Sequence, residues 1–316
     1  MSGYHPDLNA HNNARGSLTQ RAALASVSTA LLLLGLKAWA AIETGSVAML
    51  GSLADTGLDI IASLITLYSV RLAAQPADLD HRYGHGKAEA LAALFQTGVI
   101  TASAIAIGWR AISQFGNDIA PTAPELGIAV SLIAIVLTFA LIRYQRLVVK
   151  KTGSVAIQAD HVHYVSDLML NAAVIAALIL DSMLHVRGAD PLFGVAIAAW
   201  LIWHARGVAM TAIDQLMDKE WPEAKRARFL AVAQGHPALK NIHDMRTRTS
   251  GAHDFVQFHV WVDPTMTLAQ AHLVMDEIED RLMAEFPGTE VMIHPEPDGH
   301  TQGHDQPHQQ DRKSVV

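Results

Sequence analysis

Long apolar runs separated by short polar segments dominate the first two thirds of the chain. Six of these runs reach the length of roughly 20 residues that a membrane-spanning helix requires. They lie at residues 22–42, 46–71, 88–114, 124–145, 154–182 and 190–213. The pattern predicts a six-helix membrane domain over residues 21–214.

From residue 215 the pattern changes to that of a small soluble domain. Residues 222–237 and 267–286 have the apolar spacing of helices, and Thr267 is a good N-cap for the second. The segments "IHDMRTRTSG" and "HDFVQFHVWVDP" alternate apolar and polar residues as strands do, and "TEVMIHPEP" predicts a third strand. The order αββαβ predicts an α+β domain over residues 215–298, with both helices on one face of the sheet.

The distribution of basic residues predicts the orientation in the membrane. Arg71, Arg82, Lys87 and the segment "RYQRLVVKK" lie in connections on one side, whereas "ETGS" and "SQFGNDIAPTAPE" on the other side contain no Lys or Arg. The protein is expected in the inner membrane. The positive-inside rule then predicts that both termini lie in the cytoplasm. The polar segments 1–20 and 299–316 are predicted to be disordered, and the first has no apolar core typical of a cleaved signal peptide.

Composition narrows the classes of partner and ligand. Of 316 residues 51% are apolar and only 17% are charged, and the formal net charge of −7 argues against binding to nucleic acid. The chain has no cysteine. Any metal must therefore be held by His, Asp or Glu side chains.

Two carboxylates interrupt the second apolar run. Asp55 and Asp59 lie in "SLADTGLDIIASL", where a charge costs at least ~3 kcal/mol at the bilayer centre. Four residues apart, they share one face of a helix, and His163 and Asp167 form a matching pair in the fifth run. Together they offer three carboxylates and one imidazole, a tetrahedral set suited to Zn²⁺ and acceptable to Fe²⁺, Mn²⁺ or Cd²⁺. The alternative is that each acid is neutralised by a cation such as Lys37.

Further His and acidic residues gather outside the apolar runs. The loop "ADLDHRYGHGKAEA" brings Asp78, Asp80, His81 and His85 into eight residues, which is compatible either with a metal site or with a solvated loop. In the soluble domain, His243, His259 and His294 lie in predicted strands and His272 in a predicted helix. These histidines are either metal ligands or structural residues of a half-buried sheet. The tail carries His300, His304 and His308 in a polar stretch typical of a solvated segment with weak metal binding.

Signatures of common enzymes are missing from the sequence. There is no Gly-Lys-Ser/Thr phosphate loop, no HExxH and no Gly-x-Ser-x-Gly, so an ATPase, a zincin or an α/β-hydrolase is not expected. Two other functions remain open. One is a membrane-anchored metal sensor or storage protein. The other is an intramembrane metallohydrolase, against which a four-ligand site leaves the metal no open position for water.

Several segments together resemble a known family. "GSVAMLGSLADTGLDIIASL", "QPADLDHRYGHGKAEALAAL", "ADHVHYVSD" and "HDMRTRTSG" are similar to motifs of the cation diffusion facilitator family, particularly the bacterial zinc/ferrous-iron efflux pumps, and the resemblance extends over residues 20–297. It implies a homodimer of six-helix membrane domains, each followed by a cytoplasmic, ferredoxin- or metallochaperone-like domain. It also implies export of divalent metal in exchange for protons.

The resemblance implies three metal sites. The transport site is Asp55, Asp59, His163 and Asp167; the loop site is Asp78, His81 and His85; the cytoplasmic site, near the dimer interface, is His243, His259, His272, His294 and Glu296. Asp80 has no ligand role in this pattern. Glu296 stands where the family pattern has an aspartate. Lys87 and Asp218 match a charge pair that holds two protomers together near the membrane surface.

The resemblance also implies a mechanism. The aspartate-only pair in the second run is similar to the zinc/iron/cadmium type of transporter, with Mn²⁺ as a further candidate. We expect alternating access, in which protons from the far side compete for the ligands and release the metal. Metal binding to the soluble domain is expected to bias this transition by about 1–3 kcal/mol, as is usual for allosteric coupling.

Overall fold

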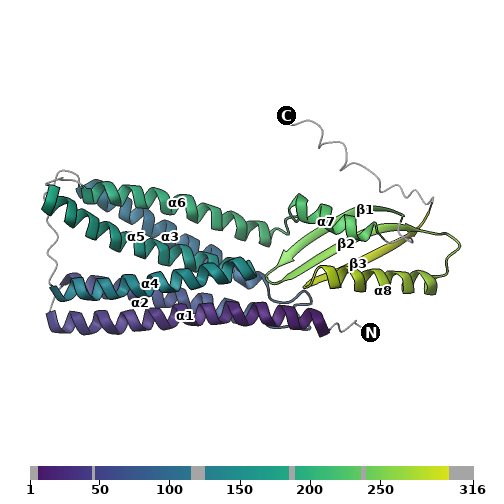
Figure 1. Cartoon of the computed structure of the whole chain (residues 1–316), viewed down its shortest axis with the longest axis horizontal. Coiled ribbons are helices and arrows are strands. Elements are labelled where there is room, and N and C mark those ends of the chain that lie inside the picture. The colour runs from purple at the N-terminus through teal and green to yellow at the C-terminus, as the bar shows by residue number, and fades with distance from the viewer. Residues whose placement is uncertain (1–5, 45–46, 115–124, 185–188, 236–239, 299–316) are drawn as a thin grey trace, which may run out of the picture. The chain divides into compact units, whose positions relative to one another are not determined.

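The computed structural model of the protein describes residues 6–44, 47–114, 125–184, 189–235 and 240–298, apart from some side chains at the ends of helices. The chain divides into two compact units (Figure 1). The first comprises residues 1–219 and 249–253, and the second comprises residues 220–248 and 254–316.

Six long helices form the first unit, and each contains most of one of the predicted apolar runs. They are α1 (Pro6–Thr44), α2 (Val47–Ala73), α3 (Lys87–Gln114), α4 (Glu125–Thr152), α5 (Val155–Leu184) and α6 (Ala189–Leu216). Within the described residues, all but α5 contain a stretch long and apolar enough to cross a membrane. Helix α5 has the necessary length, with 30 residues, but its side chains beyond residue 176 are not described. A helical membrane domain is thus confirmed, while the assignment of α5 as a sixth membrane span rests on the length of this helix.

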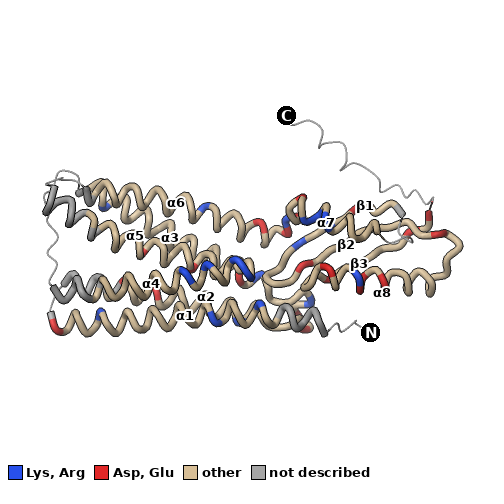
Figure 2. The backbone as a smooth tube through the Cα atoms, in the orientation of Figure 1, with Lys and Arg blue, Asp and Glu red and all other residues tan. Residues whose placement is uncertain are grey.

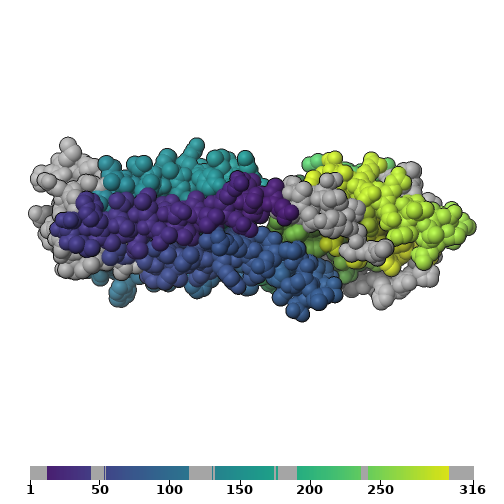
Figure 3. All heavy atoms as spheres, turned by 90° about the horizontal axis from the view of Figure 1, so that it is seen from below, coloured from purple at the N-terminus to yellow at the C-terminus, as the bar shows by residue number. Residues whose placement is uncertain are grey.

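Small residues allow the helices of this unit to pack closely. Ala90 and Ala93 of α3 are fully buried, as is Ala212 of α6, and α3 has its most extensive contacts with α6. On another face of the bundle α1 lies between α2 and α4 (Figure 3). Small residues at these contacts let the helix backbones approach closely, so that dispersion contacts and interhelical hydrogen bonds can hold the bundle in lipid.

The first helix begins earlier than the sequence pattern predicts. Residues 6–20 are helical and continue into the first membrane span, so the prediction of a disordered segment 1–20 is wrong over this part. The Arg15 side chain donates a hydrogen bond to the carbonyl oxygen of Thr152, at the last turn of α4. A cation there satisfies a helix-end carbonyl and opposes the negative end of the helix dipole. Residues 1–5 and the predicted disordered tail, 299–316, lie outside the described residues.

Basic residues mark one end of the first unit. As Figure 2 shows, Lys and Arg residues gather near the beginning of α3 and near the ends of α2 and α4. They include Arg71, Arg82, Lys87, Lys150 and Lys151. We call this end the basic end. Helices α1, α3 and α5 start there, and α2, α4 and α6 finish there.

The second unit has the predicted order αββαβ. Its elements are α7 (Glu223–Ala233), β1 (Lys240–Ser250), β2 (His253–Val262), α8 (Leu268–Glu285) and β3 (Thr289–Pro297), and the sheet order is β1-β2-β3. Strands β2 and β3 are parallel, with His259 opposite His294. Thr267 is the N-cap of α8: its side chain accepts a hydrogen bond from the Gln270 N–H, and the Gln270 side chain accepts one from the Thr267 N–H, which together form a capping box.

Both helices of this unit cover the same face of the sheet, as predicted. Phe258 of β2 and Ile293 of β3 pack with Phe229 of α7 and Ile278 of α8 in one buried core. Because side chains alternate across a strand, His259, between Phe258 and Val260, lies on the opposite face.

Strand β1 departs from simple alternation. Asn241 and Asp244 adopt positive φ angles of 45° and 44°, a conformation that Asn and Asp tolerate better than most residues. Ile242 and Met245, three residues apart, both pack against the core. The irregularity at Asp244 therefore changes which residues face the core and leaves His243 on the side of His259.

Candidate metal centres

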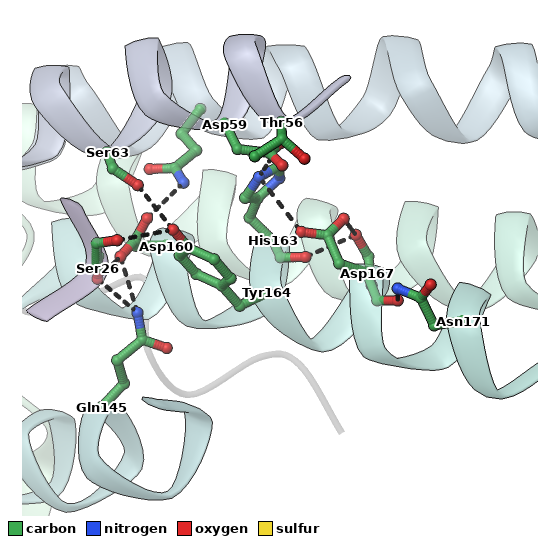
Figure 4. A network of polar contacts seen from close by, with 12 residues as sticks. Ser26, Thr56, Asp59, Ser63, Gln145, Asp160, His163, Tyr164, Asp167 and Asn171 are labelled. Carbon is green, nitrogen blue, oxygen red and sulfur yellow. Dashed lines mark hydrogen bonds and ion pairs between the residues drawn. The ribbon is translucent and has the colours of Figure 1, made fainter. Parts of the chain in front are cut away.

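Asp59 of α2 meets His163 and Asp167 of α5 in the interior of the bundle (Figure 4). The His163 Nε2 atom lies 3.0 Å from Asp59 Oδ1 and 3.7 Å from Asp167 Oδ2. One ligand atom from each of the three residues lies within 4.8 Å of the others. We call these residues the α2–α5 cluster.

The α2–α5 cluster lines a cavity of about 470 Å³. Ser166 Oγ donates to the His163 carbonyl oxygen and Asn171 Nδ2 donates to the Asp167 carbonyl oxygen, so both polar groups bond the backbone of α5. Two carboxylates and an imidazole inside a membrane domain form a donor set that a divalent cation neutralises well.

Asp55, the fourth predicted ligand, lies apart from these three residues. Its side chain is exposed, and it lines the same cavity one helical turn from Asp59. Lys37, which the alternative interpretation pairs with these acids, donates a hydrogen bond to Thr56 Oγ1 over 2.7 Å. Three of the four predicted ligands are therefore brought together, and the fourth faces the same cavity.

The loop between α2 and α3 brings Asp78, His81 and His85 together; we call them the loop cluster. Asp78 Oδ1 lies 3.3 Å from His81 Nδ1, and Asp78 Oδ2 lies 3.4 Å from His85 Nε2. Gly84, with a φ of 75°, provides the turn that returns His85 to Asp78. Asp80 does not belong to the cluster and contacts Asp78 through its backbone N–H.

The backbone of the same loop keeps Asp78 ionised. The His81 N–H, 2.6 Å from Asp78 Oδ1, lowers the pKa of this carboxyl below its usual value. The N–H of Asp80 and the two histidines act in the same direction, against a smaller opposing effect of desolvation. His85 is largely buried, and its Nδ1 has no hydrogen-bond partner within the described structure. An ionised carboxylate between two imidazoles is a suitable donor set for Zn²⁺.

In the second unit, His243 of β1, His259 of β2 and Glu296 of β3 converge on the helix-free face of the sheet; we call them the sheet cluster. His259 Nδ1 lies 2.8 Å from Glu296 Oε1, and His243 Nε2 lies 3.4 Å from Glu296 Oε2. His243 Nδ1 is 2.9 Å from the Asn241 carbonyl oxygen. That contact fixes the imidazole tautomer so that Nε2 is free to bind a metal.

The glutamate of the sheet cluster is ionised. Partial desolvation would raise the pKa of Glu296, but the hydrogen bond from His259 and the charges of the nearby histidines together hold the pKa below its usual value. Two imidazoles and an ionised carboxylate fit Zn²⁺.

The other two predicted ligands of this site are placed differently. His294 lies at the edge of the sheet cluster, with its Nε2 atom 3.9 Å from Glu296 Oε1 and its ring 4.7 Å from that of His259. His272, on α8, is exposed and lies 3.7 Å from Asp276, and it does not join the cluster within the described chain.

Lys87 and Asp218 meet within one chain. Lys87 Nζ lies 3.0 Å from Asp218 Oδ2 and 3.3 Å from the Leu216 carbonyl oxygen at the end of α6. Both side chains are more than a third exposed, so the pair contributes at most about 1 kcal/mol by itself.

The sequence pattern did not identify two acidic residues that the structure places among polar partners, Asp244 and Asp160. Asp244 Oδ2 lies 4.0 Å from His259 Nε2, and the break in alternation after His243 was the available signal. Asp160 is fully buried in α5 with hydrogen bonds from Gln96 and Gln145. An isolated glutamine within an apolar run, Gln96, was the available signal here.

Comparisons with known proteins agree with this architecture. The cation efflux transmembrane domain matches residues 23–217, and the cation efflux protein cytoplasmic domain matches residues 221–298. The chain is similar to the cation-efflux pump FieF of Cronobacter sakazakii, with 41% identity over 286 residues that cover 90% of this chain and 95% of that protein. FieF of Salmonella arizonae is 40% identical over the same shares of the two chains.

A solved structure of a metal-bound C-terminal domain of the CzcD transporter from Thermotoga maritima is 26% identical, covers 26% of this chain and all of that one, and has a TM-score of 0.25. The family match itself covers most of the chain in two adjoining domains, and it agrees with the membrane helices and the α+β unit described above. The chain therefore belongs to the cation diffusion facilitator, or cation efflux, family of membrane transporters and is not an enzyme.

Proposed function

We propose that this protein exports divalent metal ions, Zn²⁺ foremost, across the inner membrane in exchange for protons. The observation that carries the proposal is the α2–α5 cluster, which presents two carboxylates and an imidazole to a cavity inside a membrane domain. Fe²⁺, Cd²⁺ and Mn²⁺ are further candidate substrates, because the same donor set accepts them. The metal here is cargo, bound in one state and released in the next.

Coupling to protons follows from the chemistry of the ligands. Asp59, His163 and Asp167 bind metal only when they are deprotonated, so metal binding releases protons and protonation releases metal. In the proposed cycle, metal enters from the cytoplasm, the bundle changes the side to which the cavity opens, and protons from the other side displace the metal. Asp55, which lines the same cavity, is placed to join as a fourth ligand during this change.

The remaining sites are proposed to regulate transport in a homodimer. The sheet cluster and the loop cluster each fit a resident Zn²⁺ by their donor sets. Metal at the sheet cluster would tighten the dimer and bias the transport equilibrium. The Lys87–Asp218 pair would stabilise the basic end of the bundle. The positive-inside rule assigns this end, together with both termini, to the cytoplasm.

Flux through reconstituted vesicles tests the transport proposal. We expect a pH gradient to drive Zn²⁺ accumulation by vesicles that contain the protein, and collapse of the gradient to stop it. Each candidate metal should be measured in turn. Metal binding without accumulation would indicate a sensor or storage protein and would contradict the proposal.

A variant of the sheet cluster separates regulation from transport. We expect His259→Ala with His294→Ala to weaken Zn²⁺ binding to the full-length protein and to slow flux about 5–150-fold, the range of a coupling of 1–3 kcal/mol, without abolishing it. Glu296→Gln should act in the same direction, because Glu296 contacts both histidines. Calorimetry and stopped-flow flux measure the two effects.

Gln257→Ala is the matched control, since Gln257 is an exposed polar residue next to His259 on the same face of β2, with no ligand role. It should leave binding and flux unchanged. Complete loss of flux in a folded, dimeric double variant would show that the sheet cluster lies on the transport route, and the regulatory assignment would be wrong.

A further inference from the structure

Asp160 of α5 lies at the centre of a second polar cluster in the bundle (Figure 4). Its side chain is fully buried. Asp160 Oδ2 accepts hydrogen bonds from Ser26 Oγ of α1 over 2.5 Å and from Gln145 Nε2 of α4 over 2.8 Å. Asp160 Oδ1 accepts a bond from Gln96 Nε2 of α3 over 3.2 Å. One carboxyl group therefore joins four helices.

Further hydrogen bonds extend this cluster to a fifth helix. Thr66 Oγ1 of α2 donates to Gln96 Oε1 over 2.9 Å, and the Tyr164 hydroxyl donates to the Ser26 carbonyl oxygen over 3.1 Å. The members are Ser26, Thr66, Gln96, Gln145, Asp160 and Tyr164, and none is more than 2% exposed. We call them the Asp160 network.

The Asp160 network lies on one side of the cavity that holds the α2–α5 cluster. The nearest cavity-lining residue on each helix is Ala30 for Ser26, Ala62 for Thr66, Val99 for Gln96, Thr138 for Gln145 and His163 for Asp160. Helices α1, α3 and α5 start at the basic end, and in each of them the network residue precedes the cavity-lining residue in the sequence. Helices α2 and α4 finish at the basic end, and in each of them the network residue follows the cavity-lining residue. In all five helices these network residues are therefore displaced from the cavity towards the basic end, and Tyr164, next to His163, lies where the network meets the cavity.

The cavity does not extend past this network. Of the six network residues only Tyr164 lines it, while its other lining residues continue away from the basic end to Arg110 on α3 and Asn171 on α5. We propose that the Asp160 network is the gate between the α2–α5 cluster and the basic end, closed in this structure, and that it must part for metal to enter from that side. The inference rests on the proposed transport function.

Hydrogen bonding gives such a gate two distinct states. Buried polar groups in a low dielectric lose much stability when only some of them are paired, so the network favours being fully formed or fully hydrated. Gln145 Oε1 is buried without a partner in the described structure, and it offers a position from which water would begin to hydrate the network. Asp160 is therefore a positioning residue: it does not bind the metal, but it controls whether metal can reach Asp59, His163 and Asp167.

The absence of cysteine makes the gate directly testable. Ser103→Cys places a single thiol in the cavity, and Lys151→Cys, in a separate sample, marks the basic end. A membrane-impermeant maleimide is applied to the full-length protein in vesicles of both orientations, without metal. We expect the thiol at position 103 to react only from the side opposite the basic end.

Loosening the network should change this sidedness. With Asp160→Ala or Gln145→Leu added, we expect labelling of position 103 from the basic end to rise about tenfold or more, because the remaining buried groups lose their partners and hydrate. Thr97→Val is the matched control: Thr97 is buried beside Gln96, but its hydroxyl donates to Ala93 of its own helix. Labelling in that variant should stay one-sided.

Thermal unfolding of each variant distinguishes a gate from a purely structural cluster. If Asp160→Ala does not fold, Gln145→Leu and Ser26→Ala carry the test. Labelling that stays one-sided in folded network variants, or that is equal from both sides in the protein with an intact network, overturns the proposal. Because no metal is used, failure of the flux assay would leave this result standing, so the two proposals fail separately.

Discussion

Replacing Asp59 by alanine is expected to reduce metal flux more than about 100-fold, since the loss of even an outer-shell partner of a metal ligand costs about 10–100-fold in affinity. Among the described residues of α2, Asp59 supplies the carboxylate that reaches His163, at 3.0 Å. Without it, the metal would lose both a ligand and one negative charge in a medium of low dielectric. Flux into vesicles and size-exclusion chromatography of the same preparation measure transport and assembly.

Asp214→Asn is the control for this change. Asp214 is half-buried near the end of α6, outside the cavity, and pairs with the exposed Lys219. Loss of this acid should leave flux within about twofold, since a partly exposed ion pair contributes less than about 1 kcal/mol. Normal transport by a folded Asp59→Ala protein would exclude the α2–α5 cluster as the transport site.

Replacing His163 by aspartate is expected to change which metal is transported. His163 is the only nitrogen ligand of the α2–α5 cluster. An all-oxygen set favours Mn²⁺ relative to Zn²⁺ and Cd²⁺, which bind imidazole well. We expect the ratio of Zn²⁺ flux to Mn²⁺ flux to fall about tenfold or more, equivalent to about 1.4 kcal/mol of selectivity.

The comparison must separate selectivity from general damage. Parallel measurements of both metals on one vesicle preparation do so, because a folding defect lowers both fluxes together. His161→Asp is a suitable control: His161 lies on α5 two residues away, outside the α2–α5 cluster. An unchanged flux ratio in His163→Asp would exclude this imidazole as a ligand of the transported ion.

Local sequence patterns were sufficient to predict most elements of both units. Apolar length indicates where helices cross a membrane, and alternation of apolar and polar residues indicates where strands form, because each depends on neighbours within a few residues. The i,i+4 spacing of His163 and Asp167 likewise predicts a shared helix face without knowledge of any other helix. The helical extension of α1 over residues 6–20 was missed because Arg15 finds its partner at Thr152, far away in the sequence.

Only the tertiary structure decided which of the predicted ligands meet. Asp55 and Asp59 are equivalent by spacing, yet Asp59 alone reaches His163, since the position of α5 against α2 selects one turn of the helix. Glu296 joins His259 through the register of two parallel strands, which no local pattern encodes. Asp160 becomes the centre of a hydrogen-bond network only in the folded bundle, where side chains from α1, α3 and α4 converge on it. The sequence does not reveal this, because the hydrogen bonds that stabilise a buried carboxyl are made between segments distant in sequence.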